Sequence, residues 1–302
     1  RRCAKPASFC SRDMRAMMLT DHAPFKLAGI AALVGVAAAT VFVGWPDIDL
    51  AAARLFYVGP RNFLFNHSPL ATTLRWGFRA LTWGTAIAAV TGIILALARR
   101  RHLLGLGLPE WIFLALVLIT GPGLIANTVL KDNWARPRPL HVTEFGGPDR
   151  YTPALERSGA CERNCSFVSG EASATFALGF AIAMLARRRR AELMAAAVAV
   201  GSIAGLIRMG EGGHFLSDVV FAAVFMALDV ALMYWLVFHV LARRTRDEAW
   251  WHEKTLAVSG ELRRKSADAV AGGRYWLSEK FPATFGANFA AKDRPERDDE
   301  RL

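Results

Sequence analysis

The 302-residue chain contains only four cysteines and seven histidines, and they do not have the spacing of a tetrahedral zinc site. It also lacks an internal repeat of fixed period and a basic patch interleaved with aromatic residues. These absences argue against a zinc-stabilised domain, a repeat protein and a nucleic-acid-binding protein. We therefore expect no metal, no cofactor and no nucleic-acid partner.

Long apolar segments dominate what is present. Hydrophobic residues make up 53% of the chain and charged residues 21%, a balance that suits a soluble domain poorly unless the charges are segregated. Six segments approach the roughly 20 apolar residues that cross a bilayer as a helix. They are residues 27–45, 81–98, 111–130, 172–186, 191–207 and 219–241. This pattern predicts an all-α polytopic membrane protein with a bundle of six transmembrane helices and both termini on the same side.

Arginine clusters predict the orientation of these helices. They lie at 99–101, 187–190 and 243–246, all on the side where the basic N-terminal tail also lies. Short cytoplasmic loops are enriched in Lys and Arg, so this side is expected to be the cytoplasm. The prediction is a multi-pass protein of the bacterial inner membrane with both termini cytoplasmic. The net charge of +11 then reflects membrane orientation.

The expected organisation has three parts. Residues 1–25 form a cytoplasmic tail, residues 26–242 the membrane domain and residues 243–302 a second cytoplasmic tail that is partly disordered. The first apolar segment exceeds the roughly 7–15 residues of a signal-peptide core, so we expect a retained helix.

The cysteines divide between the two sides of the membrane. Cys3 and Cys10 lie in the N-terminal tail, where the cytoplasm is expected to keep them reduced. Cys161 and Cys165 lie in an outward loop, where an oxidising compartment permits a disulfide. Free thiols are the alternative for this pair.

Three polar clusters lie at ends of apolar segments, on the face opposite the arginine clusters. They are Lys131-x6-Arg138-Pro139, Ser169-Gly170-Glu171 and Arg208-x5-His214-x3-Asp218. Each has an ordinary explanation when taken alone: a cation can anchor a helix end at the headgroups, and a histidine can be structural. Asp218 is harder to explain in this way, because carboxylates within apolar runs are costly and usually functional. The meeting of all three clusters at one face predicts an active site on the periplasmic side.

The cationic members of these clusters suit a phosphate. Lys131, Arg138 and Arg208 can neutralise the non-bridging oxygens, and the planar guanidinium allows bidentate binding. Ser169 and the Gly170 amide begin an expected helix, whose N-terminus offers free N–H groups to an anion.

The remaining members suit the chemistry of phosphoryl transfer. His214 is the candidate nucleophile, and Asp218 can bind the other ring nitrogen if the segment is helical. Glu171 could donate a proton to the leaving group, provided that its pKa is raised, or it could bind water or a substrate group.

These residues resemble the type 2 phosphatidic acid phosphatase superfamily, whose signature is K-x6-R-P, then P-S-G-H, then S-R-x5-H-x3-D. Lys131-x6-Arg138-Pro139 matches the first motif in full. The third motif matches from Arg208 through Asp218, with Ile207 in place of the leading serine. The resemblance implies a six-helix membrane bundle and a phosphohistidine intermediate without a metal. The site residues that it implies are His214 as nucleophile, Asp218 as its partner, and Lys131, Arg138, Ser169, Gly170 and Arg208 as phosphate ligands.

The middle motif departs from the family pattern twice. Val168 stands where proline is usual, and Glu171 stands where the family has the histidine that protonates the departing alcohol. A carboxyl group among three cations is a poor acid at neutral pH, although a bound phosphate would raise its pKa again. The substitution leaves either an active enzyme with Glu171 as its acid or a protein that has lost activity.

The segments 165–171 and 212–218 look like the bacterial branch that acts on lipid A, the lipopolysaccharide anchor. The resemblance therefore implies a phosphoric monoester hydrolase whose substrate is a lipid, most simply lipid A in the outer leaflet of the inner membrane. Alternatives are a phosphatase of undecaprenyl diphosphate or of a glycerophospholipid, a lipid phosphotransferase, and a non-catalytic phospholipid-binding protein.

Overall fold

The computed structural model describes residues 21–99, 103–186 and 188–241, with eight further positions between 257 and 269. The chain divides into two compact units, residues 1–246 and residues 247–302. The described positions of the second unit are helical, and Glu261 and Lys265 form an ion pair of 2.9 Å on it. The predictions for Cys3, Cys10, Arg100 and most of both tails fall outside the described residues.

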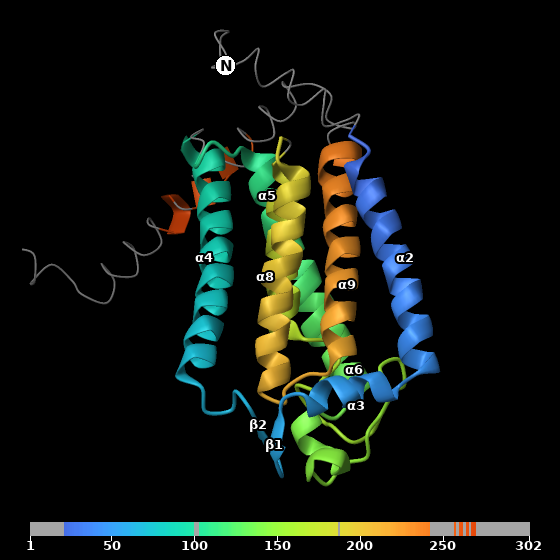
Figure 1. Ribbon diagram of the computed structural model, residues 1–302. Coiled ribbons are helices and arrows are strands. Elements are labelled where there is room, and N and C mark those ends of the chain that lie inside the picture. Colours follow the sequence, from blue (N-terminus) through green and yellow to red (C-terminus); the bar gives the residue numbers. More distant parts are fainter. Residues whose placement is uncertain are drawn as a thin grey trace, which may run out of the picture. The chain divides into compact units, whose positions relative to one another are not determined.

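Long helices build the first unit, as Figure 1 shows. They are α2 (Ala23–Gly44), α4 (Pro69–Arg99), α5 (Leu108–Leu118), the π-helix η1 (Ile119–Lys131), α7 (Gly170–Leu185), α8 (Arg190–Gly210) and α9 (Leu216–Trp235). The short helix α6 (Asp132–Trp134) continues η1, and the π-helical turn η4 (Leu236–Leu241) continues α9. Five of these helical segments are long and apolar enough to cross a membrane. The predicted all-α polytopic architecture is therefore confirmed.

The fourth predicted span, residues 172–186, differs from the other five. Its helix α7 has only 16 residues, of which ten are buried. It packs between α8, α9 and η1, and small residues allow the close approach. A Cβ on Gly179 would lie 2.6 Å from that of Ala197, and one on Gly201 would lie 2.2 Å from the Phe176 ring. Because its neighbours bury it, α7 serves as the centre of the bundle, and a six-span count stays a prediction.

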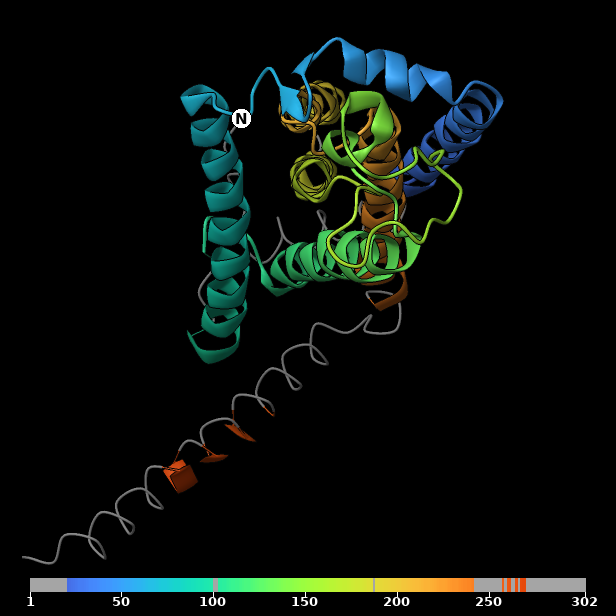
Figure 2. The ribbon, with the colours of Figure 1, turned by 90° about the horizontal axis from the view of Figure 1, so that it is seen from below.

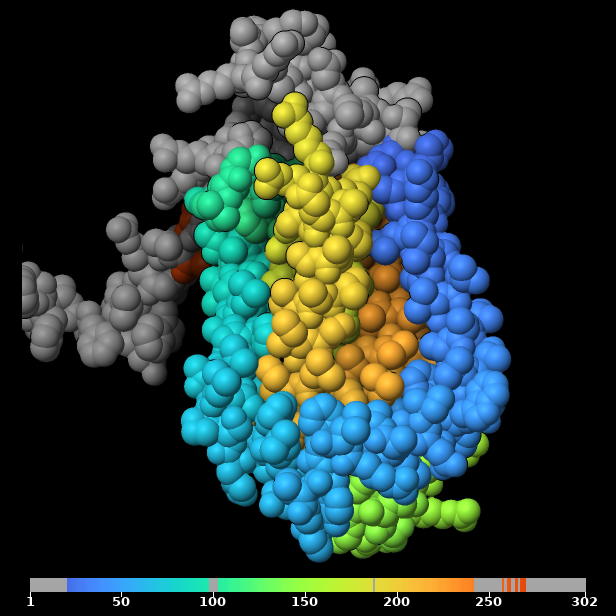
Figure 3. All heavy atoms as spheres, in the orientation of Figure 1, coloured from blue at the N-terminus to red at the C-terminus, as the bar shows by residue number. Residues whose placement is uncertain are grey.

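The second helix begins earlier than the sequence predicted. The expected span started at residue 81, but α4 starts at Pro69. Arg75 and Arg79 interrupt the apolar pattern, and both pair with carboxylates instead of ending the helix. Seen from below in Figure 2, α4 lies at one edge of the bundle. It packs against α5, α7 and α8, and the space-filling view of Figure 3 shows it side by side with α8. Trp76 and Trp83 on it are exposed.

A cap of short elements covers one end of the bundle. It contains helix α3 (Asp47–Arg54), the hairpin of β1 (Tyr57–Gly59) and β2 (Asn62–Phe63), and the 3-10 turns η2 (Pro139–His141) and η3 (Thr143–Phe145). Tyr57 pairs with Phe63 in the hairpin. A small core of its own joins the cap to α9, formed by Leu50, Ala53, Phe63, Val142, Phe145 and Phe215. This cap fixes the loops that carry the polar clusters.

Candidate active site

All three predicted clusters lie at the capped end of the bundle (Figure 1). The end of η1 carries Lys131, the start of α7 follows Ser169, and the last turn of α8 carries Arg208. The loop from α8 to α9 carries His214. Antiparallel packing of the helices thus brings together residues that are up to 83 positions apart in the sequence.

Lys131 and Arg138 converge on one residue that the sequence analysis did not select. Lys131 Nζ donates a hydrogen bond of 3.1 Å to Asn164 Oδ1, and Arg138 Nη2 donates one of 2.6 Å to the Asn164 carbonyl oxygen. Cys161 and Cys165 form a disulfide that encloses Asn164. This short loop therefore holds both cations at fixed positions.

The start of α7 completes this cradle. The Ser169 hydroxyl is buried and has no hydrogen-bond partner among the described residues. A Cβ on Gly170 would lie 3.1 Å from Lys131 Nζ, so glycine allows the lysine to approach the helix N-terminus closely. A free hydroxyl, an ammonium group and a helix start together form a site for an anion.

Arg208 contributes a third cation from the end of α8. Its Nη1 atom contacts Glu211 Oε2, and its Nε atom lies 3.7 Å from Glu171 Oε2. Gly213 packs against its guanidinium group, because a Cβ there would lie 2.6 Å from Arg208 Nη2.

The environment of His214 fixes which ring nitrogen carries the proton. Nδ1 lies 2.7 Å from the Ser166 carbonyl oxygen. A carbonyl oxygen only accepts, so Nδ1 must donate, and the lone pair then resides on Nε2. Burial lowers the pKa of His214 to about 4, and the charges of Arg208 and Lys131 act in the same direction. The ring is therefore neutral and nucleophilic at neutral pH.

Asp218 lies beside His214 and also joins two neighbouring segments. His214 precedes α9, and its Nδ1 atom lies 3.7 Å from Asp218 Oδ2. The carboxylate also accepts hydrogen bonds from Phe215 N at 2.8 Å and Ser166 Oγ at 2.5 Å. Asp218 thus caps α9 and holds the Ser166 segment, whose carbonyl oxygen contacts the histidine.

A buried arginine behind Asp218 escaped the sequence analysis. Arg136 has no exposed surface and donates to Asp218 Oδ1 at 2.6 Å and to Asp49 Oδ2 at 2.8 Å. It also donates to Ser217 Oγ at 2.9 Å. Its sequence signal was an Arg-Pro pair two residues before Arg138. Arg136 joins the cap, the first-motif loop and α9 into one network.

Glu171 is held by two further arginines that the sequence analysis did not select. Arg75 forms a bidentate pair with it at 2.9 and 3.0 Å, and Arg79 Nη2 lies 2.6 Å from Oε1. Arg75 also donates to Glu211 at 3.0 Å. Two arginines beside a predicted outward loop oppose the usual charge asymmetry, and that conflict was the available signal.

The chain is similar to known proteins of one family. The sequence profile of the PAP2 superfamily matches residues 109–242. A lipid A 4'-phosphatase of Rhizobium leguminosarum is 31% identical over 193 residues, which are 60% of this chain and 83% of that enzyme. The chain belongs to the PAP2 superfamily. This confirms the resemblance drawn from its motifs.

Two further relatives of this PAP2 protein are also named lipid A 4'-phosphatase. The one from Francisella tularensis subsp. novicida is 45% identical over 128 residues, 42% of this chain and 57% of its own length. The one from Rhizobium etli is 30% identical over 199 residues, 59% of this chain and 75% of its own length. No solved structure matches. The family and these names support a phosphoric monoester hydrolase of the lipid phosphatase type.

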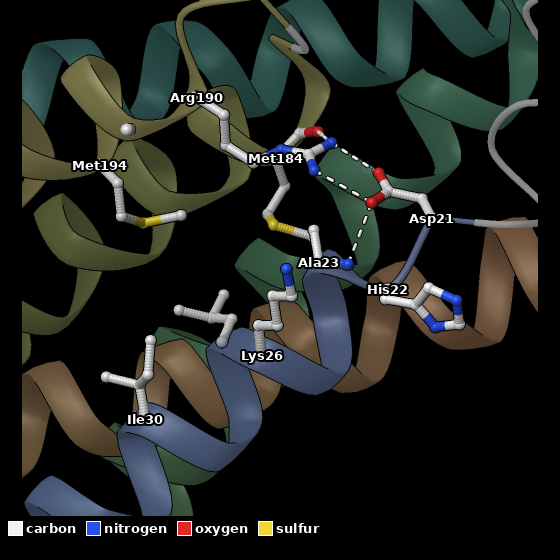
Figure 4. A pocket seen from close by; sticks show the side chains of 10 residues that line it. Asp21, His22, Ala23, Lys26, Ile30, Met184, Arg190 and Met194 are labelled. Atoms are coloured by element: carbon white, nitrogen blue, oxygen red, sulfur yellow. Dashed lines mark hydrogen bonds and ion pairs between the residues drawn. The ribbon is translucent and has the colours of Figure 1, made fainter.

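The opposite end of the PAP2 bundle contains a cavity of about 710 Å³. Figure 4 shows Asp21 there, with both carboxylate oxygens facing Arg190 at 3.1 and 2.6 Å. Leu27, Ile30 and Met194 line it, and none of the predicted site residues does. No cluster of three or more His, Cys, Asp or Glu suited to a metal occurs among the described residues. The predicted site residues thus lie at the capped end and not at this cavity.

Proposed function

We propose that this protein is a membrane phosphatase that hydrolyses a phosphomonoester on the headgroup of lipid A. Three relatives bearing that name support the substrate. The observation that carries the proposal is the state of His214, which keeps a free Nε2 lone pair because Nδ1 faces the Ser166 carbonyl oxygen. Few structural roles require a buried imidazole to stay neutral beside three cations.

The proposed reaction has two steps. Nε2 of His214 attacks the phosphorus, and the bond from phosphorus to the leaving oxygen breaks while that oxygen takes a proton. Lys131, Arg138 and Arg208 offset the charge on the non-bridging oxygens, with Ser169 and the Gly170 amide as further donors. Water then attacks the phosphohistidine, which releases phosphate and restores the imidazole.

The proton for the leaving oxygen is the open step. Glu171 is the acid expected from the sequence, but Arg75, Arg79 and Arg208 favour its ionised form, which accepts hydrogen bonds and cannot donate one. As an acid, it would first need a proton, which the negative charge of a bound phosphate favours. Hydrolysis by the Glu171→Gln variant distinguishes this acid role from a role in ligand binding.

The proposed location is the bacterial inner membrane, with the capped end in the periplasm and both termini in the cytoplasm. Arg188, Arg189 and Arg190 lie at the end of the bundle opposite His214, which agrees with the positive-inside tendency. A periplasmic site would meet lipid substrates in the outer leaflet.

Hydrolysis by purified protein in detergent micelles tests the proposal. Wild type and His214→Ala would be offered lipid A, undecaprenyl diphosphate and phosphatidic acid separately, without added metal. His67→Ala is a matched control, because His67 is exposed and lies near the capped end. We expect phosphate release from lipid A by wild type and the control, and none by His214→Ala. Release only from another lipid would replace the substrate, and transfer of phosphate to a second lipid would indicate a phosphotransferase. Lipid binding without any release would favour the non-catalytic alternative.

A further inference from the structure

The Glu171 carboxylate lies among the cations of the proposed anion site. Its Oε2 atom lies 3.7 Å from Arg208 Nε, so a phosphate that binds Arg208 must lie beside this carboxylate. The Glu171 side chain is 17% exposed, so a ligand in the cradle can reach it. A bound ligand therefore meets one negative group at a site otherwise made for anions.

The arginines of α4 prevent Glu171 from moving away. Arg75 binds both carboxylate oxygens, and Arg79 binds Oε1 from one helical turn further along. Arg79 also lies 5.5 Å over the Trp76 ring, and its own side chain is 45% exposed. Because α4 lies at one edge of the bundle in Figure 2, these ion pairs add a polar attachment to α7 at the capped end.

The total charge of the site does not distinguish one phosphate group from two. Five cations surround it, and two carboxylates, Glu171 and Glu211, offset part of their charge. The cations are Arg75, Arg79, Lys131, Arg138 and Arg208. Glu171 and Glu211 both pair with Arg208, and Arg75 of α4 pairs with both carboxylates. Five positive and two negative charges leave an excess of three, enough for either a phosphomonoester dianion or a diphosphate, so any selectivity depends on the position of the carboxylate beside Arg208.

We propose that Glu171, fixed by Arg75 and Arg79, makes this site selective for phosphomonoesters against diphosphates. The ionised carboxylate repels a second phosphate next to the reacting one. This inference rests on the proposed function, because it assumes that the cradle of Lys131, Arg138 and Arg208 binds the reacting phosphate.

Binding of two inorganic probes tests the selectivity without requiring turnover. The dissociation constants of orthophosphate and pyrophosphate would be measured by calorimetry on the full-length protein in detergent. Variants are Glu171→Gln, which removes the charge at nearly constant shape, and Glu171→Asp, which keeps it. Glu144→Gln is the matched control, since Glu144 is exposed on η3 at the same end. Should Glu171→Gln fail to yield folded protein, Glu171→Ala removes the same charge.

We expect Glu171→Gln to shift the preference toward pyrophosphate by at least about tenfold, because juxtaposed like charges cost that much or more. Glu171→Asp and Glu144→Gln should keep the wild-type ratio. An unchanged ratio in Glu171→Gln, with lipid A still hydrolysed, would overturn the selectivity while leaving the proposed function intact. Loss of hydrolysis in Glu171→Gln at an unchanged ratio would instead assign it the acid role. Failure of wild type to bind either probe would remove the proposed function itself.

Discussion

Arg136 is the residue whose replacement should affect the protein most strongly without touching the substrate. Arg136→Met removes a fully buried guanidinium group that donates to Asp49 and Asp218 from opposite sides. Both carboxylates are themselves buried and would lose their charge partner. Removing one member of a buried ion pair costs about 3–5 kcal/mol, because the other charge is left uncompensated.

The expected loss can be measured as a change in melting temperature. For a domain of this size, about 3–5 kcal/mol corresponds to a decrease of roughly 6–20 °C in Tm. Heating the detergent-solubilised protein and following the monodisperse fraction by gel filtration gives this value. Arg150→Met is the control, because Arg150 is exposed on the same loop. Arg136→Lys should fall between, since one ammonium group cannot replace the separate bonds to Asp49, Asp218 and Ser217.

Activity provides the second measurement for Arg136→Met. Without its partner, Asp218 should no longer hold the Ser166 segment that orients His214. Phosphate release should then fall well before the protein unfolds. A variant that melts within about 2 °C of wild type would refute the argument, because it would mean that the network contributes little to stability.

Three other predictions concern the cradle. In the pH profile of kcat/KM, the acidic limb that belongs to His214 should lie near pH 4. Protonation of the buried ring removes the nucleophile only as the pH falls through the lowered pKa. A limb near pH 6.5, the usual pKa of histidine, would contradict this. Replacing both Cys161 and Cys165 by serine should raise KM several-fold more than it lowers kcat, since the loop orders two phosphate-binding cations; equal effects on both would argue against that role. Gly213→Ala should raise KM about tenfold by displacing Arg208, and wild-type kinetics in this variant would show that the guanidinium tolerates the methyl group.

The sequence was most informative where particular residue types stand at a fixed spacing within a motif. Lys131, Arg138, Arg208 and His214 were all selected from motif spacing, and the structure brings them to one end of the bundle. Apolar length likewise predicted the helices, because hydrocarbon thickness sets the number of residues required. The predicted start at residue 81 lies well after the observed start of α4 at Pro69, since apolar length cannot recognise a charge that finds a partner in another helix.

Partners from distant segments could not be found in this way. Arg75 lies 96 residues before Glu171, and Asp49 lies 87 residues before Arg136. No local pattern connects such pairs, because only packing decides which helix faces which. For the same reason, spacing suggested Asp218 as a partner of His214, which lies 3.7 Å from it, but could not identify the Ser166 carbonyl oxygen 2.7 Å from the same ring nitrogen.

The sequence by itself determined the class of protein and the kinds of atoms available to it. Apolar length required a membrane bundle, and three motifs supplied cations, a histidine and carboxylates at the ends of its helices. The tertiary structure alone decided how those groups are used: which nitrogen of His214 is free, why Asp218 is tied to Arg136, and why Glu171 stays fixed beside Arg208. The reason is that residue type and spacing set what a side chain can do, whereas its protonation and orientation depend on neighbours that only folding brings near.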